Sequence, residues 1–152
     1  MNKIFPDNYP PDLMERIIED GAENNTFEKV YRIANYGENN RDAFLSTFLT
    51  NLRDNMNINI RDTFIAGTNN YDIGTYGTSL TSNKKRAIST LRLMERKYNG
   101  PILLKGTIFP EYGMSMYTKD SKRRKAYSKY HIDWWLYKNE DPSEHFSIIE
   151  VN

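Results

Sequence analysis

The chain has 152 residues, 38% of them apolar and 13% aromatic, which is enough for one globular domain with a hydrophobic core and too little for two. It contains no cysteine and two histidines, which excludes disulfides, thiolate metal sites and a cysteine nucleophile and makes a metal site of any kind unexpected. No apolar run is long enough to cross a membrane, and the chain starts without a signal-peptide core. We therefore expect a single cytoplasmic domain, residues 1–152, with no membrane association.

The net charge of +1 hides an uneven distribution along the chain. Residues 1–82 carry 7 basic and 12 acidic groups, and residues 131–152 carry 1 basic and 5 acidic groups. Between them, residues 83–130 carry 13 basic and 3 acidic groups, a net charge of +10. Such a block can attract the phosphates of a nucleic acid or a dinucleotide, contact an acidic partner, or form a solvated helix face and loop.

The first half of the chain predicts a short helix, a strand and a longer helix. Residues 1–26 are expected to form a lead-in with one helix that begins at Asp12, and residues 27–33 have the β-branched and aromatic content of a strand. An apolar stripe at helical spacing predicts an amphipathic helix over residues 42–54. Residues 55–75 are rich in Asn, Asp, Thr and Gly, which indicates a long irregular connection.

The second half predicts one helix and several strands. Ser82 is expected to cap a helix that ends at the Asn99-Gly100-Pro101 sequence. Residues 109–129 are expected to be a turn followed by a basic loop. The strands are expected over residues 74–81, 102–108, 131–138 and 145–151. Helices early and mid-chain followed by clustered strands predict an α+β fold with a mainly antiparallel sheet, in which residues 27–152 form the core.

Two early features are candidates for binding. Arg32 lies in a strand otherwise built for burial, so it needs an anionic partner, and the guanidinium geometry suits a phosphate as well as a carboxylate. Thr78 and Ser79 form a hydroxyl pair where a strand runs into a helix. Their hydroxyls can serve as helix-cap and strand-end hydrogen-bonding groups or can contact a ligand.

A late strand carries a histidine and an aspartate two residues apart. Because side chains alternate along a strand, His131, Asp133 and Trp135 are expected to share one face, and Ile132 and Trp134 the other. We expect the first face to be polar and the second to belong to the core.

Taken in order, these segments resemble the ADP-ribosyltransferase fold over residues 27–152. The strings that carry the resemblance are Val-Tyr-Arg ending at Arg32, Tyr-Gly-Thr-Ser-Leu-Thr starting at Tyr76, Ile-Leu-Leu-Lys-Gly-Thr-Ile, His-Ile-Asp-Trp-Trp-Leu starting at His131, and Pro-Ser-Glu-His-Phe-Ser-Ile-Ile-Glu-Val. The resemblance implies NAD as co-substrate and is closest to the branch with an arginine, a serine motif and a glutamate.

In that branch the first-strand arginine holds the NAD pyrophosphate, and Arg32 matches it. Thr78 and Ser79 match the last two positions of the serine motif, which braces the site around the nicotinamide ribose, and Tyr76 is expected to contribute to NAD binding beside them. Asp133 matches the glutamate that stabilises the oxocarbenium-like transition state. Asp133 and Ser79 are therefore the implied catalytic residues, together with His131 as an assisting or orienting group.

The chain departs from the family pattern at three positions. Gly77 replaces the first serine, Asp133 is one methylene shorter than glutamate, and His131 stands where a second acid often lies. A shorter carboxylate still serves if its strand lies closer to the ribose, because electrostatic stabilisation depends on placement near the developing charge.

A second resemblance concerns the setting of the protein. The strings Asn-Arg-Asp-Ala-Phe-Leu-Ser, Gly-Thr-Tyr-Gly-Thr-Ser and His-Ile-Asp-Trp-Trp-Leu-Tyr-Lys are similar to those of small proteins from phages and prophages of low-GC Gram-positive bacteria. This resemblance implies a phage-encoded host-takeover or counter-defence protein that acts in the host cytoplasm.

Two other functions fit the sequence. The chain can be a non-enzymatic inhibitor of a host defence protein or ribonucleoprotein, comparable to an anti-CRISPR protein. It can also be a nucleic-acid binder that uses the basic block, in which Lys122, Arg123, Arg124 and Lys125 are followed by tyrosines suited to base stacking.

Overall fold

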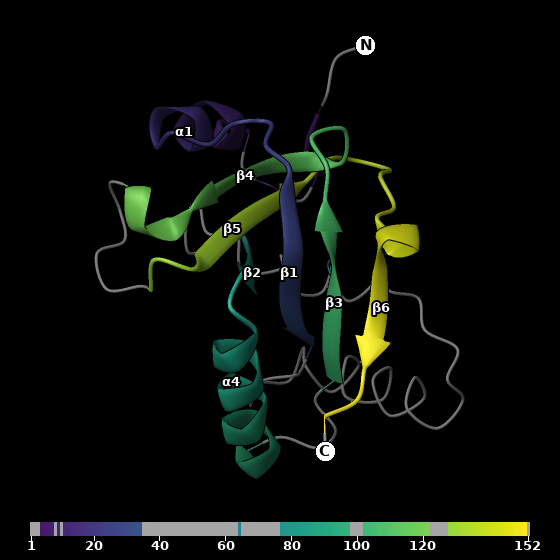
Figure 1. Cartoon of the computed structure of the whole chain (residues 1–152). Helices are drawn as coiled ribbons and strands as arrows, with labels where there is room; N and C mark the ends of the chain where they lie inside the picture. The colour runs from purple at the N-terminus through teal and green to yellow at the C-terminus, as the bar shows by residue number, and fades with distance from the viewer. Residues whose placement is uncertain are drawn as a thin grey trace.

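The computed structural model describes residues 4–7, 9, 11–34, 64, 77–97, 102–121 and 128–151. The α-helices in this part of the chain are α1 (Leu13–Glu19) and α4 (Lys84–Lys97), the strands are β1 (Phe27–Ala34), β2 (Thr78–Thr81), β3 (Ile102–Ile108), β4 (Gly113–Tyr117), β5 (His131–Leu136) and β6 (Phe146–Ile149), and two 3-10 turns are η2 (Thr118–Asp120) and η3 (Ser143–His145) (Figure 1). The helix expected over residues 42–54 lies outside the described residues, as does the connection over 55–75 apart from Phe64.

The six strands form one sheet in the order β4-β5-β2-β1-β3-β6, and every neighbouring pair is antiparallel. This arrangement confirms the expected α+β class with an antiparallel sheet. In Figure 1, β4 and β5 cross the view obliquely while β1, β3 and β6 stand upright, as the twist of a sheet requires.

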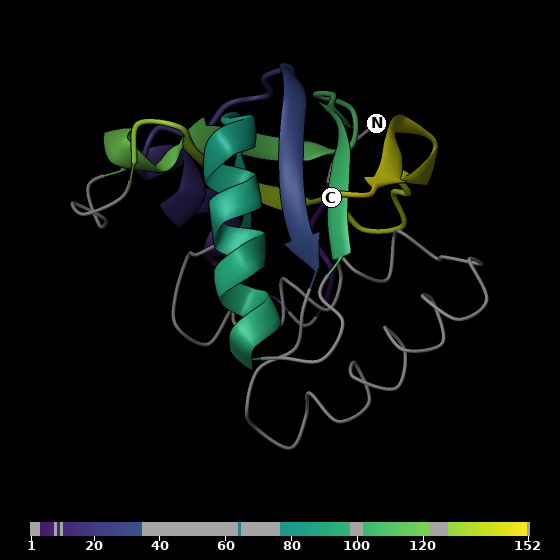
Figure 2. The ribbon, with the colours of Figure 1, turned by 60° about the horizontal axis from the view of Figure 1, so that its bottom comes forward.

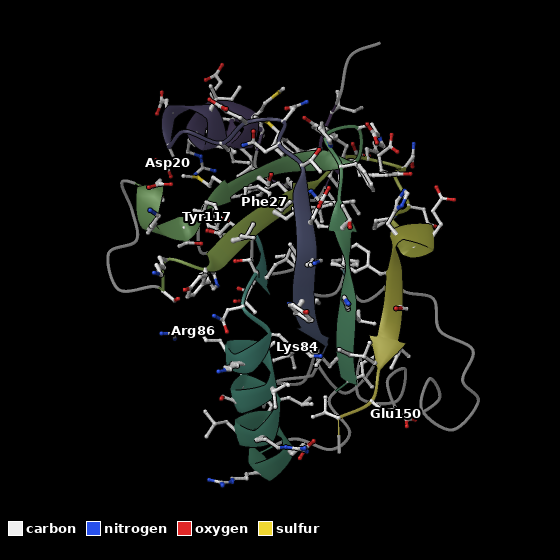
Figure 3. All side chains as sticks on the ribbon, viewed as in Figure 1. Asp20, Phe27, Lys84, Arg86, Tyr117 and Glu150 are labelled. Atoms are coloured by element: carbon white, nitrogen blue, oxygen red, sulfur yellow. The ribbon has the colours of Figure 1, made fainter. Side chains whose placement is uncertain are left out.

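The sheet consists of two well-paired halves that meet at a short junction. Between β1 and β2 the register pairs Tyr31 with Thr81, whereas β1 pairs with β3 along most of its length. Above this junction the rings of Phe27 and Tyr117 meet edge to face at 5.0 Å between centroids, so an aromatic contact also joins the halves (Figure 3). The junction therefore depends on few contacts.

Each face of the sheet buries apolar side chains, but in different ways. One face carries a continuous cluster, which we call the main core: Val30, Phe64, Leu80, Ile102, Leu104, Ile108, Ile132, Trp134, Leu136 and Phe146. On the other face α1 packs with Met114, Met116 and Trp135, and α4 packs through Ala87 and Leu91 on Tyr31 and Leu103. Figure 2 shows α4 lying alongside β1. We call this second face the helix face.

Helix α4 begins where a side chain can take up a free backbone amide. The Asn83 Oδ1 atom accepts a hydrogen bond from the Arg86 amide at 2.9 Å, which satisfies one of the donors that a helix leaves unpaired at its start. The cap is therefore Asn83, and the expectation that Ser82 caps this helix was wrong by one residue. The Ser82 amide instead donates to the Tyr130 carbonyl at 3.0 Å.

Strand β4 was not expected, because residues 109–129 were interpreted as a turn and a loop. Its sequence, Gly-Met-Ser-Met-Tyr, lacks the β-branched residues that indicate strands. The strand nevertheless pairs with β5 over its whole length, and a Cβ atom at Gly113 would lie 2.3 Å from the Trp135 carbonyl oxygen. Pairing with β5 therefore decides the conformation of this segment, against its local preference.

Candidate functional site

Arg32 is a half-buried cation on β1, and its side chain lies on the main-core face of the sheet. It stands opposite Leu104 of β3, and its Nη1 atom donates to the Ser79 carbonyl at 3.2 Å across the β1–β2 junction. Its Nε atom is buried without a hydrogen-bond partner, and burial lowers the pKa of Arg32 to about 10. None of the ion pairs among the described residues involves Arg32. A partly buried guanidinium without a counter-charge costs folding free energy unless an anion joins it.

The two hydroxyl residues of β2 have different surroundings. Thr78 is buried, and its hydroxyl donates to the Phe64 carbonyl at 3.5 Å, so it is occupied within the main core. Ser79 is exposed and lies directly opposite Asp133 of β5. Of the pair, Ser79 is the one that a ligand can reach.

His131 and Asp133 are linked through Thr118, a residue that the sequence analysis did not single out. The Thr118 hydroxyl is fully buried and donates to Asp133 Oδ2 at 2.9 Å, while its oxygen also lies 2.5 Å from His131 Nδ1. Because a hydroxyl has one proton, which here goes to the carboxylate, the proton of the second bond comes from His131 Nδ1. Thr118 lies 13 residues before His131 and 15 before Asp133, so no local sequence pattern could have indicated the contact.

The face expected to be polar is only partly polar. Asp133 is 2% exposed and Trp135 is 3% exposed, because α1 covers the Trp135 end of β5. The interpretation that His131, Asp133 and Trp135 share a polar surface was therefore wrong for Trp135. What remains is a polar strip on the helix face between the two apolar clusters, formed by Ser79, Thr81, His131 and Asp133.

The structure brings most of the expected site residues together, but on two faces of the sheet. Ser79 is the common point, since its carbonyl accepts from Arg32 and its backbone pairs with that of Asp133. Strand alternation places Arg32 and Thr78 on the main-core face, and Ser79, His131 and Asp133 on the helix face. Arg32 and Asp133 are thus linked only indirectly, because each contacts the backbone of Ser79. Tyr76 lies outside the described residues, as do Lys122–Lys125.

Gly77, where the resemblance would place a serine, has no room for a side chain. A Cβ atom at Gly77 would lie 2.7 Å from the Trp134 carbonyl oxygen and 2.9 Å from the Trp134 backbone nitrogen. These distances are shorter than a side chain tolerates without a backbone shift. A serine therefore does not fit at this position, and Ser79 is the accessible hydroxyl of the motif.

Comparison of the chain with protein-family models, with characterised proteins and with solved structures finds no match. Neither α1 nor α4 is long and apolar enough to span a membrane, and these are the α-helices of the described part of the chain. Among the residues that the structure describes, no three His, Asp or Glu side chains are grouped to hold a metal ion.

The polar contact through Thr118 predicts a measurable loss of stability. Replacing Thr118 with valine keeps the side-chain shape and leaves the Asp133 carboxylate without one donor in a buried position, which we expect to cost about 1–2 kcal/mol of unfolding free energy. Urea denaturation followed by circular dichroism measures this loss. Thr118→Ser, which keeps the hydroxyl, should lose less, and equal losses for the two variants would show that the hydroxyl does not contribute.

Proposed function

We propose that this protein binds NAD at the β1–β2 junction and acts as an ADP-ribosyltransferase-like, phage-encoded counter-defence protein. The observation that carries the proposal is the half-buried Arg32 side chain, whose buried Nε atom has no hydrogen-bond partner and which has no ion pair among the described residues. Proteins rarely leave such a group without a counter-charge unless a ligand supplies one.

A pyrophosphate is the anion that best suits this position. A guanidinium offers a planar set of donors that matches phosphate oxygens, and one Nη1 donor of Arg32 is already used by the Ser79 carbonyl, which fixes the orientation of the group. Because the Nε atom is buried, a phosphate would be bound through the Nη groups of Arg32. The exposed Ser79 hydroxyl is suited to hydrogen-bond a ribose, but it leaves the sheet on the face opposite to Arg32, so the ligand would have to extend past the short β1–β2 junction to reach it.

Asp133 then supplies the negative charge that the reaction needs. When the bond between nicotinamide and ribose breaks, positive charge develops on the ribose, and a fixed carboxylate close to it stabilises the transition state. Asp133 pairs with Ser79, shares its face and is oriented by the Thr118 hydroxyl. In this mechanism Arg32 binds, Ser79 positions the ribose, and Asp133 stabilises the charge.

The Arg32→Met variant tests the proposal, because binding and stability should change in opposite directions. Loss of a charge-assisted contact is expected to weaken NAD binding at least about tenfold. Burial lowers the folded-state pKa of Arg32 from its ordinary value to about 10, so the folded protein bears the full cost of the charge below about pH 10, and the cost falls only as the pH rises from there. At pH 7 we therefore expect methionine to raise the unfolding free energy by about 1–2 kcal/mol.

Isothermal titration calorimetry with NAD measures the binding, and urea denaturation measures the stability. Arg96→Met is the matched control, because Arg96 is exposed on α4, and it should change neither quantity. An absence of NAD binding by the unmodified protein, or equal binding by Arg32→Met, would contradict the proposal.

A second candidate function is non-enzymatic inhibition of a host defence protein, and the burial of Asp133 favours it. A carboxylate that is 2% exposed and hydrogen-bonded to Thr118 also has the properties of a structural group. In this case a host protein should copurify with the chain in a fixed ratio, and Arg32→Met and Asp133→Asn should not release it. Release by either variant would instead connect partner binding to the proposed NAD site.

A further inference from the structure

Helix α4 presents a basic surface that its own acidic residues do not neutralise. Lys84, Lys85, Arg86 and Arg96 are exposed, and none of them takes part in an ion pair among the described residues. The one acidic residue of the helix, Glu95, is engaged by Arg92 at 3.3 Å. The charge on this surface is therefore available to an external anion.

The position of these cations works against the stability of the helix. Lys84, Lys85 and Arg86 occupy the first turn, which contains no acidic residue, and the N-terminal end of a helix already carries a partial positive charge. Each cation placed there destabilises the helix relative to a neutral residue. Figure 3 shows Lys84 on the side of this turn nearer to β1 and Arg86 on the side away from it, so the charge surrounds the end of the helix.

A neighbouring turn extends the surface. The hydrogen bond from the Ser82 amide to the Tyr130 carbonyl holds residues 128–130 beside the start of α4, and Lys129 is exposed there. Lys119 also belongs to the basic segment of the sequence, but its Nζ atom lies 3.9 Å from the Asp120 carboxylate. We therefore leave Lys119 out of this surface. We define the basic face as Lys84, Lys85, Arg86, Arg96 and Lys129.

The chemistry of the basic face fits a nucleic-acid backbone better than an acidic protein. Protein interfaces are centred on apolar and aromatic side chains, whereas the exposed surface of α4 has one exposed large apolar residue, Leu93. Ser89 and Thr90 are exposed on the same helix, and hydroxyls of this kind commonly donate to phosphate oxygens. From Lys85 to Arg96 the helix spans roughly 16 Å, enough to follow several phosphates.

We propose that the basic face binds the phosphate backbone of a nucleic acid. This inference does not depend on the proposed NAD site, because none of the five residues contacts Arg32, Ser79 or Asp133 in any hydrogen bond or ion pair among the described residues. The proposed partner is recognised by its charge and its hydrogen-bond acceptors, so we expect no preference for base sequence.

Fluorescence anisotropy with labelled probes tests the inference. The probes are a 20-base-pair DNA duplex and a 20-nucleotide single-stranded RNA, which distinguish the two sources of a phosphate backbone. The triple variant Lys84→Gln, Lys85→Gln, Arg86→Gln is expected to bind the preferred probe at least tenfold more weakly at 100 mM salt. The slope of log affinity against log salt should become less steep by about 2–3, since roughly one counterion is released for each phosphate contact.

A matched triple variant removes the same charge elsewhere. Arg16→Gln, Lys105→Gln, Lys138→Gln changes cations outside the basic face, two of which already pair with Asp12 and Asp7, and it should weaken binding less than threefold. Thermal unfolding of the α4 variant should be unchanged or shifted upward, which shows that it folds. Failure of the unmodified protein to bind either probe at 50 mM salt, or equal weakening in both triple variants, would overturn the inference. The Arg32→Met variant should bind the probe normally, which separates this result from the NAD experiment.

Discussion

Replacement of Trp134 with alanine is expected to lower the unfolding free energy by about 3–5 kcal/mol, the range for removing a large buried aromatic side chain. Trp134 is 1% exposed. Its ring meets Phe64 edge to face at 5.2 Å between centroids, and it stacks on Phe146 at 6.3 Å. The indole therefore connects β5 to β6 and to Phe64, three segments that are far apart in the sequence.

Urea denaturation followed by circular dichroism measures this effect, and Leu93→Ala provides the control. Leu93 is also a large apolar residue but is 57% exposed on α4, so its truncation should change stability by less than about 0.5 kcal/mol. Similar losses for the two variants would mean that the main core does not depend on Trp134 as the packing indicates.

The elements that the sequence predicts correctly are those whose local signals agree with their packing. The strand over residues 27–33 and the helix ended by Asn99-Gly100-Pro101 correspond to β1 and α4. In α4 the apolar residues recur at helical spacing, and the buried Ala87 and Leu91 follow it. In β1 the signal is the β-branched and aromatic content, since the buried Val30 and Tyr31 are consecutive and do not alternate. The alternation Ile132, Trp134 and Leu136 likewise predicts a core face, and all three belong to the main core.

Strand β4 and Thr118 could not be predicted, because both depend on contacts between segments. Residues 113–117 have weak strand preference and become a strand by pairing with β5. Thr118 matters only because β4 ends beside the start of β5, which brings its hydroxyl to His131 and Asp133. A sequence pattern records periodicity along one segment and carries little information about register between two segments.

The candidate site shows the same limit. From the sequence, Arg32, Ser79 and Asp133 are expected to share one site. The structure places them on three strands, where the Ser79 carbonyl accepts from Arg32 and the backbone of Ser79 pairs with Asp133. The sequence does not reveal that the side chains of Arg32 and Asp133 leave the sheet on opposite faces, because one residue of register decides the face of every side chain in a strand. The side chains of Arg32 and Asp133 are therefore separated by the sheet, and it is the backbone of Ser79 that adjoins both residues.

Replacement of Gly106 with alanine is expected to lower the unfolding free energy by about 2–4 kcal/mol, because the added methyl group has no space. A Cβ atom at this position would lie 2.3 Å from the His145 carbonyl oxygen and 2.4 Å from Cδ1 of Phe146. Gly106 of β3 is paired with Phe146 of β6, so the clash acts on the start of the edge strand. We expect β6 to separate locally from β3 before the rest of the sheet unfolds.

Amide hydrogen exchange measures this local opening, and urea denaturation measures the total loss. In Gly106→Ala the amides of β6 should exchange faster, while those of β5 at the other side of the sheet should keep their protection until global unfolding. Ser147→Ala is the control in the same strand pair, since Ser147 is exposed opposite Lys105 and should change stability by less than about 0.5 kcal/mol. If the amides of β6 exchange at the same rate in Gly106→Ala, the Phe146 side chain moves aside without a loss of stability. Close packing at Gly106 would then not be what holds β6 against β3.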